Sequence, residues 1–279
     1  MNDDQRGETA SDQVTAETTV ESPKKPAEKP EKSAVARQAE SGGWGETLRT
    51  IVYAILIAIG IRTVAYEPFN IPSGSMLPTL LIGDYLFVSK FSYGYSRYSL
   101  PFGMPIIPGR ILFDEPERGD VVVFKLPTDN ATDYIKRIVG LPGDTIQLVE
   151  SVLHINGKPV ERRKVEDFIN EESPGQFSRS TRYIETLPNG REHYILEEWE
   201  NTAYDTTGVY KVPQGHYFAM GDNRDHSRDS RFLDQVGYVP KNNLVGRAEF
   251  LFFSIDGRPW QFWTWGDSLR SERIFTSIE

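Results

Sequence analysis

The chain of 279 residues contains no cysteine and only four histidines. The absence of cysteine excludes a disulfide framework, a thiolate zinc site and a cysteine nucleophile. No histidine stands at a metal-type spacing from another, so we interpret all four as ordinary polar residues: His154, His193, His216 and His226. We therefore expect neither a metal nor any other cofactor.

Positive charge is also in short supply. The chain has 31 Lys and Arg against 40 Asp and Glu, a formal net charge of −9, and no basic stripe that could neutralise several phosphates. This balance argues against a nucleic-acid partner. The Gly-X-Ser-X-Gly pattern of a nucleophile elbow is absent as well. In contrast, hydrophobic residues make up 38% of the chain and aromatic residues 12%, which is enough for a folded core.

Large apolar side chains are nearly absent from residues 1–43, which are rich in Glu, Asp, Lys, Ser, Thr and Pro. Burial in such a segment cannot offset its ordering entropy, so we predict a disordered tail. The composition changes at Trp44, and residues 48–66 read LRTIVYAILIAIGIRTVAY. Nineteen helical residues span about 28 Å, close to the hydrocarbon thickness of a bilayer. We predict a transmembrane anchor over residues 44–66.

Two other structures would also fit the apolar run. A buried core helix is disfavoured because the run has no polar face. A cleaved signal peptide fits the apolar residues 51–61 and the Thr-Val-Ala sequence at 63–65, but the preceding segment is long and largely acidic. We favour a retained anchor. Positive charges lie on its amino side: Lys29, Lys32, Arg37 and Arg49. The positive-inside rule then places the tail in the cytoplasm and the rest of the chain outside.

The remaining sequence predicts strands. Runs of β-branched and aromatic residues are bounded by Gly, Pro or Asp, as in DVVVF (120–124), YIKRIVG (134–140), GHYFAM (215–220) and RAEFLFF (247–253). Asn156-Gly157 and Asn189-Gly190 are tight-hairpin signals. No helical pattern of about 10–15 residues alternates with these strands, which argues against a parallel α/β sheet. We predict a mainly β fold, with a catalytic core over 67–147 and 213–257, a polar inserted lobe over 148–212 and an aromatic C-terminal segment over 258–279.

Directly after the apolar run comes Asn-Ile-Pro-Ser-Gly-Ser-Met-Leu-Pro at residues 70–78. Ser75 follows Gly74 and lies between two prolines, in a stiff segment that leaves its hydroxyl available. A plain Pro/Ser/Gly loop leaving a membrane span explains the pattern equally well. If Ser75 is a nucleophile it needs a base, and no histidine lies in a convincing catalytic segment.

A desolvated lysine can serve as that base if its pKa falls by about three units. Lys136 is the best-placed candidate because it lies mid-strand, on the face that alternation assigns to Tyr134 and Ile138. Lys90 and Lys125 lie at strand ends, where solvation is easier. A lysine that reaches solvent from a strand edge remains an equal alternative on this pattern alone.

Residues 221–231, Gly-Asp-Asn-Arg-Asp-His-Ser-Arg-Asp-Ser-Arg, mix charges of both signs directly after an apolar strand. A solvated loop is the simpler interpretation. So dense a mixture after GHYFAM favours a buried network of ion pairs and hydrogen bonds that braces a site. The arginines argue against a calcium cage, and the spacing of an EF-hand is missing.

Together, these segments resemble bacterial type I signal peptidase. The apolar anchor is followed in order by PSGSMLPTLLIGD (72–84), RGDVVVF (118–124), DYIKRIVGLPGD (133–144) and GDNRDHSRDSR (221–231), and the resemblance covers roughly residues 45–257. It implies a largely antiparallel β fold with an inserted β-ribbon lobe, preceded by one transmembrane helix. It also implies a membrane-bound serine endopeptidase that removes signal peptides from exported preproteins.

The resemblance assigns roles to particular residues. Ser75 would be the nucleophile and Lys136 the general base, with an oxyanion hole formed by the Ser73 hydroxyl and the Ser75 main-chain N–H. Ser227 would orient the lysine. The structural ion pairs would be formed by Arg137, Asp222, Asp229 and Arg231. The substrate would lie as an added strand between residues 69–73 and 133–136, which include Asn70, Pro72 and Asp133. Shallow pockets for small residues at the −1 and −3 positions would be lined by Phe69, Ile71, Met76, Leu80, Tyr134 and Ile135.

Three features depart from the family pattern. His226 stands where asparagine is frequent, the lobe has no cysteine, and one span precedes the catalytic core where some relatives have two. The expected partners are signal-peptide-bearing preproteins and membrane lipid, which the WQFWTW segment (260–265) would contact unless it packs in the core. The sequence indicates nothing about oligomeric state. A self-cleaving repressor relative is disfavoured by the membrane span, and a catalytically inactive scaffold is disfavoured because Ser75, Lys136 and Ser227 are all present.

Overall fold

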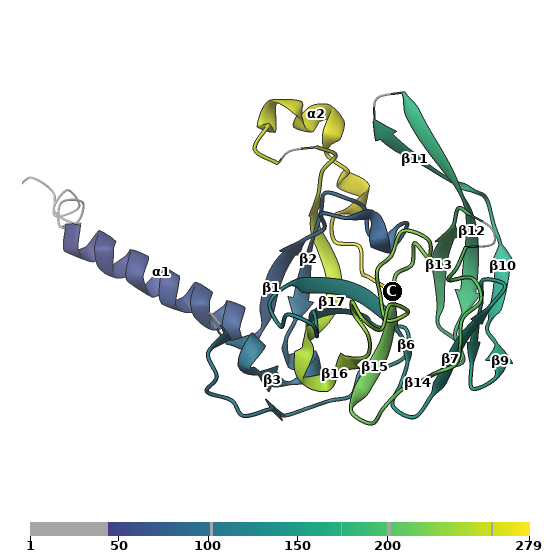
Figure 1. The fold of residues 1–279 in the computed structure, drawn as a ribbon. Coiled ribbons are helices and arrows are strands. Elements are labelled where there is room, and N and C mark those ends of the chain that lie inside the picture. Colours follow the sequence, from purple (N-terminus) through teal and green to yellow (C-terminus); the bar gives the residue numbers. More distant parts are fainter. Residues whose placement is uncertain (1–43, 101–102, 174, 200–201, 258) are drawn as a thin grey trace, which may run out of the picture. The chain divides into compact units, whose positions relative to one another are not determined.

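A computed structural model of the protein describes residues 44–100, 103–173, 175–199, 202–257 and 259–279 (Figure 1). The predicted disordered tail over residues 1–43 lies outside the described residues. The first element is the helix α1 (Trp44–Val64), which has no buried residue. Its exposure disfavours the alternative of a core helix. Within the described part of the chain, α1 is the one helix that is long and apolar enough to cross a membrane.

The largest sheet has seven antiparallel strands in the order β1-β2-β17-β5-β6-β15-β16. Its strands are β1 (Tyr66–Asn70), β2 (Asp84–Ser89), β5 (Val121–Lys125), β6 (Asp133–Gly140), β15 (His216–Met220), β16 (Val239–Pro240) and β17 (Leu244–Ser254). The four apolar runs singled out in the sequence form β5, β6, β15 and β17. Residues 121–124 are all buried because β5 lies inside the sheet with both faces covered.

The other strands form smaller antiparallel sheets. One has the order β10-β12-β11 with β13 also paired to β12, a second has the order β14-β7-β8-β9, and a third joins β3 to β4. Their bounds are β3 (Tyr95–Ser96), β4 (Arg110–Ile111), β7 (Thr145–Val149), β8 (Val152–Ile155), β9 (Lys158–Pro159), β10 (Glu161–Lys164), β11 (Phe168–Ser173), β12 (Gln176–Thr186), β13 (Glu192–Glu197) and β14 (Tyr210–Lys211). A short helix, α2 (Trp265–Ser268), follows β17. The predicted mainly β, largely antiparallel fold is confirmed.

The two Asn-Gly pairs form different turns. Asn156 and Gly157 are the two residues between β8 and β9, and both have positive φ angles, 54° and 76°. This is the conformation that a tight two-residue hairpin requires. The second pair lies in a wider loop, in which the Leu187 N–H donates to the Arg191 carbonyl at 2.8 Å and Gly190 has φ 86°. Asn189-Gly190 therefore lies in a hairpin, as predicted, but the loop is wider than the tight turn that we expected.

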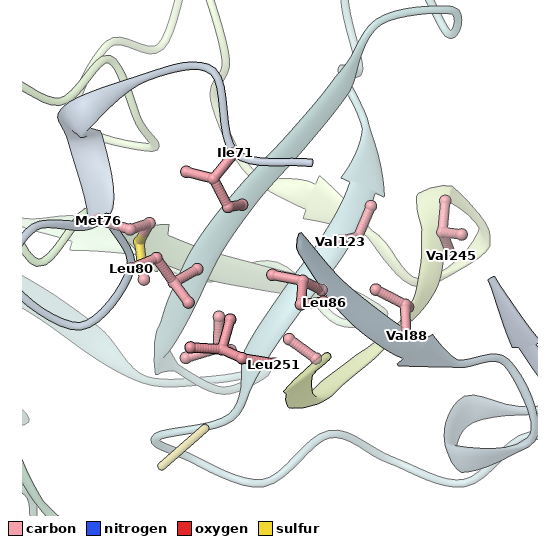
Figure 2. Packing of buried hydrophobic residues seen from close by; sticks show 10 residues of the cluster. Ile71, Met76, Leu80, Leu86, Val88, Val123, Val245 and Leu251 are labelled. Atoms are coloured by element: carbon pink, nitrogen blue, oxygen red, sulfur yellow. The ribbon is translucent and has the colours of Figure 1, made fainter. Parts of the chain in front are cut away.

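The hydrophobic core beside the first residues after β1 contains Ile71, Met76 and Leu80, packed with buried residues of β2, β5 and β17 (Figure 2). All three side chains are almost fully buried. Phe69 on β1 and Ile135 on β6 are partly buried and also pack against this cluster. The segment that carries Ser75 is therefore fixed on its inner side by apolar packing.

Candidate active site

Ser75 lies on a 3₁₀ turn, Gly74–Met76, that is closed by the Leu77 N–H donating to the Gly74 carbonyl at 3.2 Å. Asn223 holds the turn from the other side. Its main-chain N–H donates to the Ser75 carbonyl at 3.2 Å, and its Nδ2 donates to the Gly74 carbonyl at 3.1 Å. The Ser75 side chain is only 9% exposed. Apolar packing below and Asn223 beside it thus orient one hydroxyl group.

Lys136 reaches this hydroxyl from the middle of β6. Its Nζ lies 2.7 Å from Ser75 Oγ and 2.8 Å from the main-chain oxygen of Ile135. The Lys136 side chain is buried, with 3% exposure. The structure therefore brings together two residues that are 61 positions apart in the sequence.

Burial controls the charge of Lys136. Desolvation disfavours the ammonium form and lowers the pKa of Lys136 to about 8, although the nearby carboxylates of Asp229 and Asp222 act to raise it. An ordinary lysine with a pKa near 10.4 is about 0.4% neutral at pH 8, whereas this one is about half neutral. A neutral amine has a lone pair, so Lys136 can accept the proton of Ser75 near neutral pH.

The predicted ion pairs lie behind this dyad. Arg137 makes a two-point contact with Asp222, with Nε to Oδ1 at 2.9 Å and Nη2 to Oδ2 at 2.8 Å, and Thr79 Oγ1 donates to Asp222 Oδ2 at 2.6 Å. Burial alone would raise the pKa of Asp222, but Arg137 and its hydrogen bonds hold that pKa below its ordinary value. Both side chains are almost fully buried. Removing either partner would leave an unpaired buried charge.

Asp229 and Arg231 form the second predicted pair, with Arg231 Nε 2.9 Å from Asp229 Oδ1. Asp229 Oδ2 also accepts the Gly221 N–H at 3.0 Å. A side chain at Gly221 would clash with Ser227 Oγ at 2.2 Å and with the Ser75 carbonyl at 2.5 Å, so only glycine fits there. Ser227 is buried at this point, but within the described residues its hydroxyl makes no hydrogen bond to Lys136. Its role in orienting the lysine stays a prediction.

A third buried charge network joins Arg224, from the segment predicted to form buried ion pairs, to two residues that the sequence did not single out. Arg224 Nη2 donates to Glu185 Oε2 at 2.5 Å, and His193 Nε2 lies 3.4 Å from the same oxygen. All three side chains are buried. Burial acts to raise the pKa of Glu185, but Arg224 and His193 lower it well below its ordinary value. The sequence could have indicated this network only through the pairing of β12 with β13. That pairing places Glu185 opposite His193, but it requires the register of the two strands to be known.

A groove with a volume of about 550 Å³ opens over Ser75 and Lys136. Its walls come from β1, the segment that follows it and the start of β6. They include six of the predicted substrate-binding residues: Phe69, Asn70, Pro72, Asp133, Tyr134 and Ile135. The exposed Ser73 also lines the groove. Of the predicted pocket residues, Ile71, Met76 and Leu80 lie instead in the buried cluster beneath the groove.

Both strands that border the groove have free edges. Among the described strands, β1 pairs only with β2, and β6 pairs with β15 only from Arg137 onward. The N–H and C=O of Ile138 bind residues 119 and 120 beside β5, so alternation points the main-chain groups of Ile135 and Asp133 toward the groove. An extended peptide could therefore add as a strand here.

Comparison with known proteins agrees with this site. The family model described as "Signal peptidase, peptidase S26" matches residues 44–253. Signal peptidase I of Rickettsia typhi is 42% identical over 248 residues, covering 82% of this chain and 92% of the relative. Signal peptidase I of Rickettsia conorii is 42% identical over 254 residues, covering 84% and 92%. The resemblance inferred from the sequence is confirmed.

Among solved structures, a crystal structure of a signal peptidase I from Enterococcus faecalis is 26% identical and covers 48% of this chain and 97% of that chain. The TM-score of 0.28 is too low for the superposition to bear on the fold.

Proposed function

The chain belongs to the signal peptidase family, peptidase S26, and we propose that Ser75 and Lys136 are the nucleophile and general base with which it removes signal peptides from exported preproteins. The observation that carries this proposal is the 2.7 Å contact between Ser75 Oγ and the Nζ of a lysine whose pKa is about 8. The enzyme is a serine endopeptidase, and these two groups meet the geometric and protonation requirements of such a reaction.

The chemistry follows from the geometry. Neutral Lys136 accepts the Ser75 proton while Oγ attacks the carbonyl carbon of the residue before the scissile bond. The protonated amine then gives this proton to the departing nitrogen, and the bond breaks to leave an acyl ester on Ser75. A water molecule, deprotonated by the same lysine, hydrolyses the ester and frees both groups for another cycle. No histidine takes part.

The free edges of β1 and β6 support a backbone-led mode of substrate binding. A signal peptide that lies between them would hydrogen-bond to main-chain groups, and small side chains at −1 and −3 would face the surface formed by Phe69, Tyr134 and Ile135. Backbone recognition tolerates varied sequences, while the shallow surface admits only small residues. We predict cleavage after Ala-X-Ala-type sites without added metal, measured by mass spectrometry of both products of a purified preprotein. Failure to cleave any such preprotein would favour the inactive-scaffold alternative.

Ser73 is proposed to complete the oxyanion hole together with the Ser75 main-chain N–H. It lies two residues before the nucleophile, exposed and in an extended conformation with φ −133° and ψ 152°, at the rim of the groove. We expect Ser73→Ala to lower kcat by about 10–1,000-fold with little change in KM, because an oxyanion donor acts mainly in the transition state. Ser73→Thr keeps the hydroxyl and should retain more activity. A raised KM with little change in kcat in Ser73→Ala would assign Ser73 to substrate binding instead.

We further propose that α1 anchors the enzyme in the inner membrane, with residues 1–43 in the cytoplasm and the β-rich part on the outer side. The length and apolar surface of α1 and the positive charges before it support this topology. Substrates held in the bilayer by their own apolar segments would then meet the groove at the membrane surface. Protease accessibility in sealed vesicles of known orientation tests the arrangement.

Lipid contact is proposed for the WQFWTW segment. The side chains of Trp260, Phe262 and Trp263 are 65%, 71% and 67% exposed, whereas Trp265 packs against Phe253 with ring centroids 5.3 Å apart. Exposed aromatic residues of this kind favour a membrane interface. We expect Trp263→Ser with Phe262→Ser to reduce the activation of cleavage by phospholipid vesicles several-fold, while Leu233→Ser, also at an exposed apolar position, leaves it unchanged. Undiminished lipid activation in the double variant would dismiss the contact.

A further inference from the structure

A second groove begins at Ser75 and runs away from β1 and β6. It has a volume of about 730 Å³ and shares Ser73, Ser75 and His226 with the first groove. One wall is formed by the chain after the nucleophile, including Ile82. The opposite wall is formed by β11, including Ile169, and by the end of β13 with Glu198 directly after it. A peptide cleaved at Ser75 must have chain on both sides of the scissile bond, and the two grooves offer room for both.

The order of the elements decides which half of the substrate enters which groove. The first groove is bordered by β1, which begins at Tyr66, directly after α1 ends at Val64. If α1 is the membrane anchor, the half of the substrate held in the membrane occupies the first groove. The second groove is then left for the residues that follow the scissile bond, which become the start of the mature protein. This assignment rests on the proposed function of Ser75 and Lys136.

The far wall of the second groove is fixed to the site by hydrogen bonds rather than by loose packing. The Leu196 N–H on β13 donates to the Asp222 carbonyl, and the Arg224 N–H donates to the Leu196 carbonyl, both at 2.9 Å. Asp225 Oδ2 accepts the N–H groups of Glu198 and Trp199 at 2.7 and 3.0 Å. The loop that holds the Ser75 turn through Asn223 thus also sets the position of the groove wall.

A buried ion pair reinforces this connection. Arg224 from the same loop pairs with Glu185 on β12, and both side chains are at most 3% exposed. Two buried charges would be costly unless they remained paired, so the lobe strands cannot shift away from the loop without a large loss of free energy. The wall therefore holds a defined distance from Ser75, which a subsite that discriminates between side chains requires.

The lining of the groove indicates what it would accept. Ile82 and Ile169 are 52% and 65% exposed and line the two walls, so each leaves apolar surface open to the groove. Glu198 lies at the end next to Ser75, with Oε2 2.6 Å from His226 Nε2. Apolar side chains would gain burial between the isoleucines, and a carboxylate near Glu198 would meet like charge.

We propose that this second groove binds the two or three residues after the scissile bond and selects among preproteins there. In it, Ile82 and Ile169 contact an apolar side chain, and Glu198 opposes an acidic one. The β11–β13 lobe is then a specificity element of the protease, because it supplies a wall of the site on which the mature sequence rests.

The test uses two preproteins that differ only in the second residue after the scissile bond, glutamate or lysine. We expect the full-length enzyme to cleave the lysine substrate about five-fold faster in kcat/KM, and Glu198→Arg to reverse that preference. Glu161→Arg is the matched control, with the same charge change at an exposed β10 position outside both grooves. A second pair of preproteins has leucine or asparagine at the same position. The wild-type enzyme should cleave the leucine substrate faster, and Ile169→Ala should lose this preference.

Separate outcomes distinguish this inference from the proposed function. An unchanged charge preference in Glu198→Arg, or an equal reversal in Glu161→Arg, would overturn the role of the second groove while cleavage after the −1 residue continued. Absence of cleavage of every substrate by the wild-type enzyme would refute the proposed function, and the groove assignment with it. Reversal confined to Glu198→Arg, with an unaltered cleavage position, is the expected result.

Discussion

Ser75→Ala is expected to reduce cleavage of a preprotein by about 10⁴-fold or more, because it removes the hydroxyl oxygen that lies 2.7 Å from Lys136 Nζ and acts as the proposed nucleophile. The change deletes one oxygen atom and leaves the turn, the groove walls and the ion pairs in place. Substrate binding should therefore persist, and the loss should fall on kcat. Single-turnover cleavage with excess enzyme, followed by mass spectrometry, measures the chemical step directly.

A matched control is available for this variant. Ser271 is exposed on a 3₁₀ turn near the C-terminal end of the chain and lines neither groove. Ser271→Ala should leave kcat and KM unchanged. Cleavage by Ser75→Ala at more than one-tenth of the wild-type rate would remove Ser75 from the role of nucleophile.

The second large effect is expected for Lys136→Arg, which should reduce cleavage as severely as the loss of Ser75. Arginine keeps the positive charge, but its pKa lies above about 12, so it cannot accept a proton near neutral pH. Lys136→Met should also be inactive. Lys211→Met is the matched control, because it removes the same amine from an exposed residue of β14, and it should leave activity unchanged.

Loss of folding can be separated from loss of chemistry at Lys136. Its pKa is lowered from 10.5 to about 8, so the folded state binds fewer protons than the unfolded state between these values, and stability rises with pH across that window. Below pH 8 the buried ammonium costs about 3 kcal/mol of folding free energy relative to the neutral amine. Lys136→Met should thus unfold at pH 7 no more easily than the wild type. Full activity in Lys136→Arg or Lys136→Met would assign the base elsewhere.

The strands could be predicted from the sequence because local patterns mark them. A run such as residues 121–124 must be buried on both faces, and this burial places it inside the sheet. Alternation along β6 likewise turns Lys136 away from solvent. Ser75 could be singled out because it lies in a stiff segment between two prolines. Only the family resemblance linked it to Lys136, because the two residues are brought together by packing between distant segments.

The parts that escaped prediction depend on long-range register. Nothing local to Glu185 or His193 marks them as buried, and both acquire their environment only when β12 pairs with β13 and meets Arg224. The same holds for the second groove, whose walls at Ile82 and Ile169 are 87 residues apart (169 − 82). In a polar lobe, the sequence does not indicate which charged residues will form buried ion pairs. The wider turn at Asn189-Gly190 shows the same limit, since the dipeptide marks a hairpin without fixing its loop length.

The pH dependence of kcat/KM for a signal-peptide substrate tests the assignment of Lys136 most directly, because this ratio reports the ionisation of groups in the free enzyme. With Lys136 as the base, kcat/KM should rise with pH as the amine loses its proton and level off above an apparent pKa of about 8. The substrate should carry no titratable side chain near the scissile bond. A profile that is flat between about pH 6 and 9.5, or one with its inflection near the ordinary histidine value of about 6.5, would contradict a lysine base.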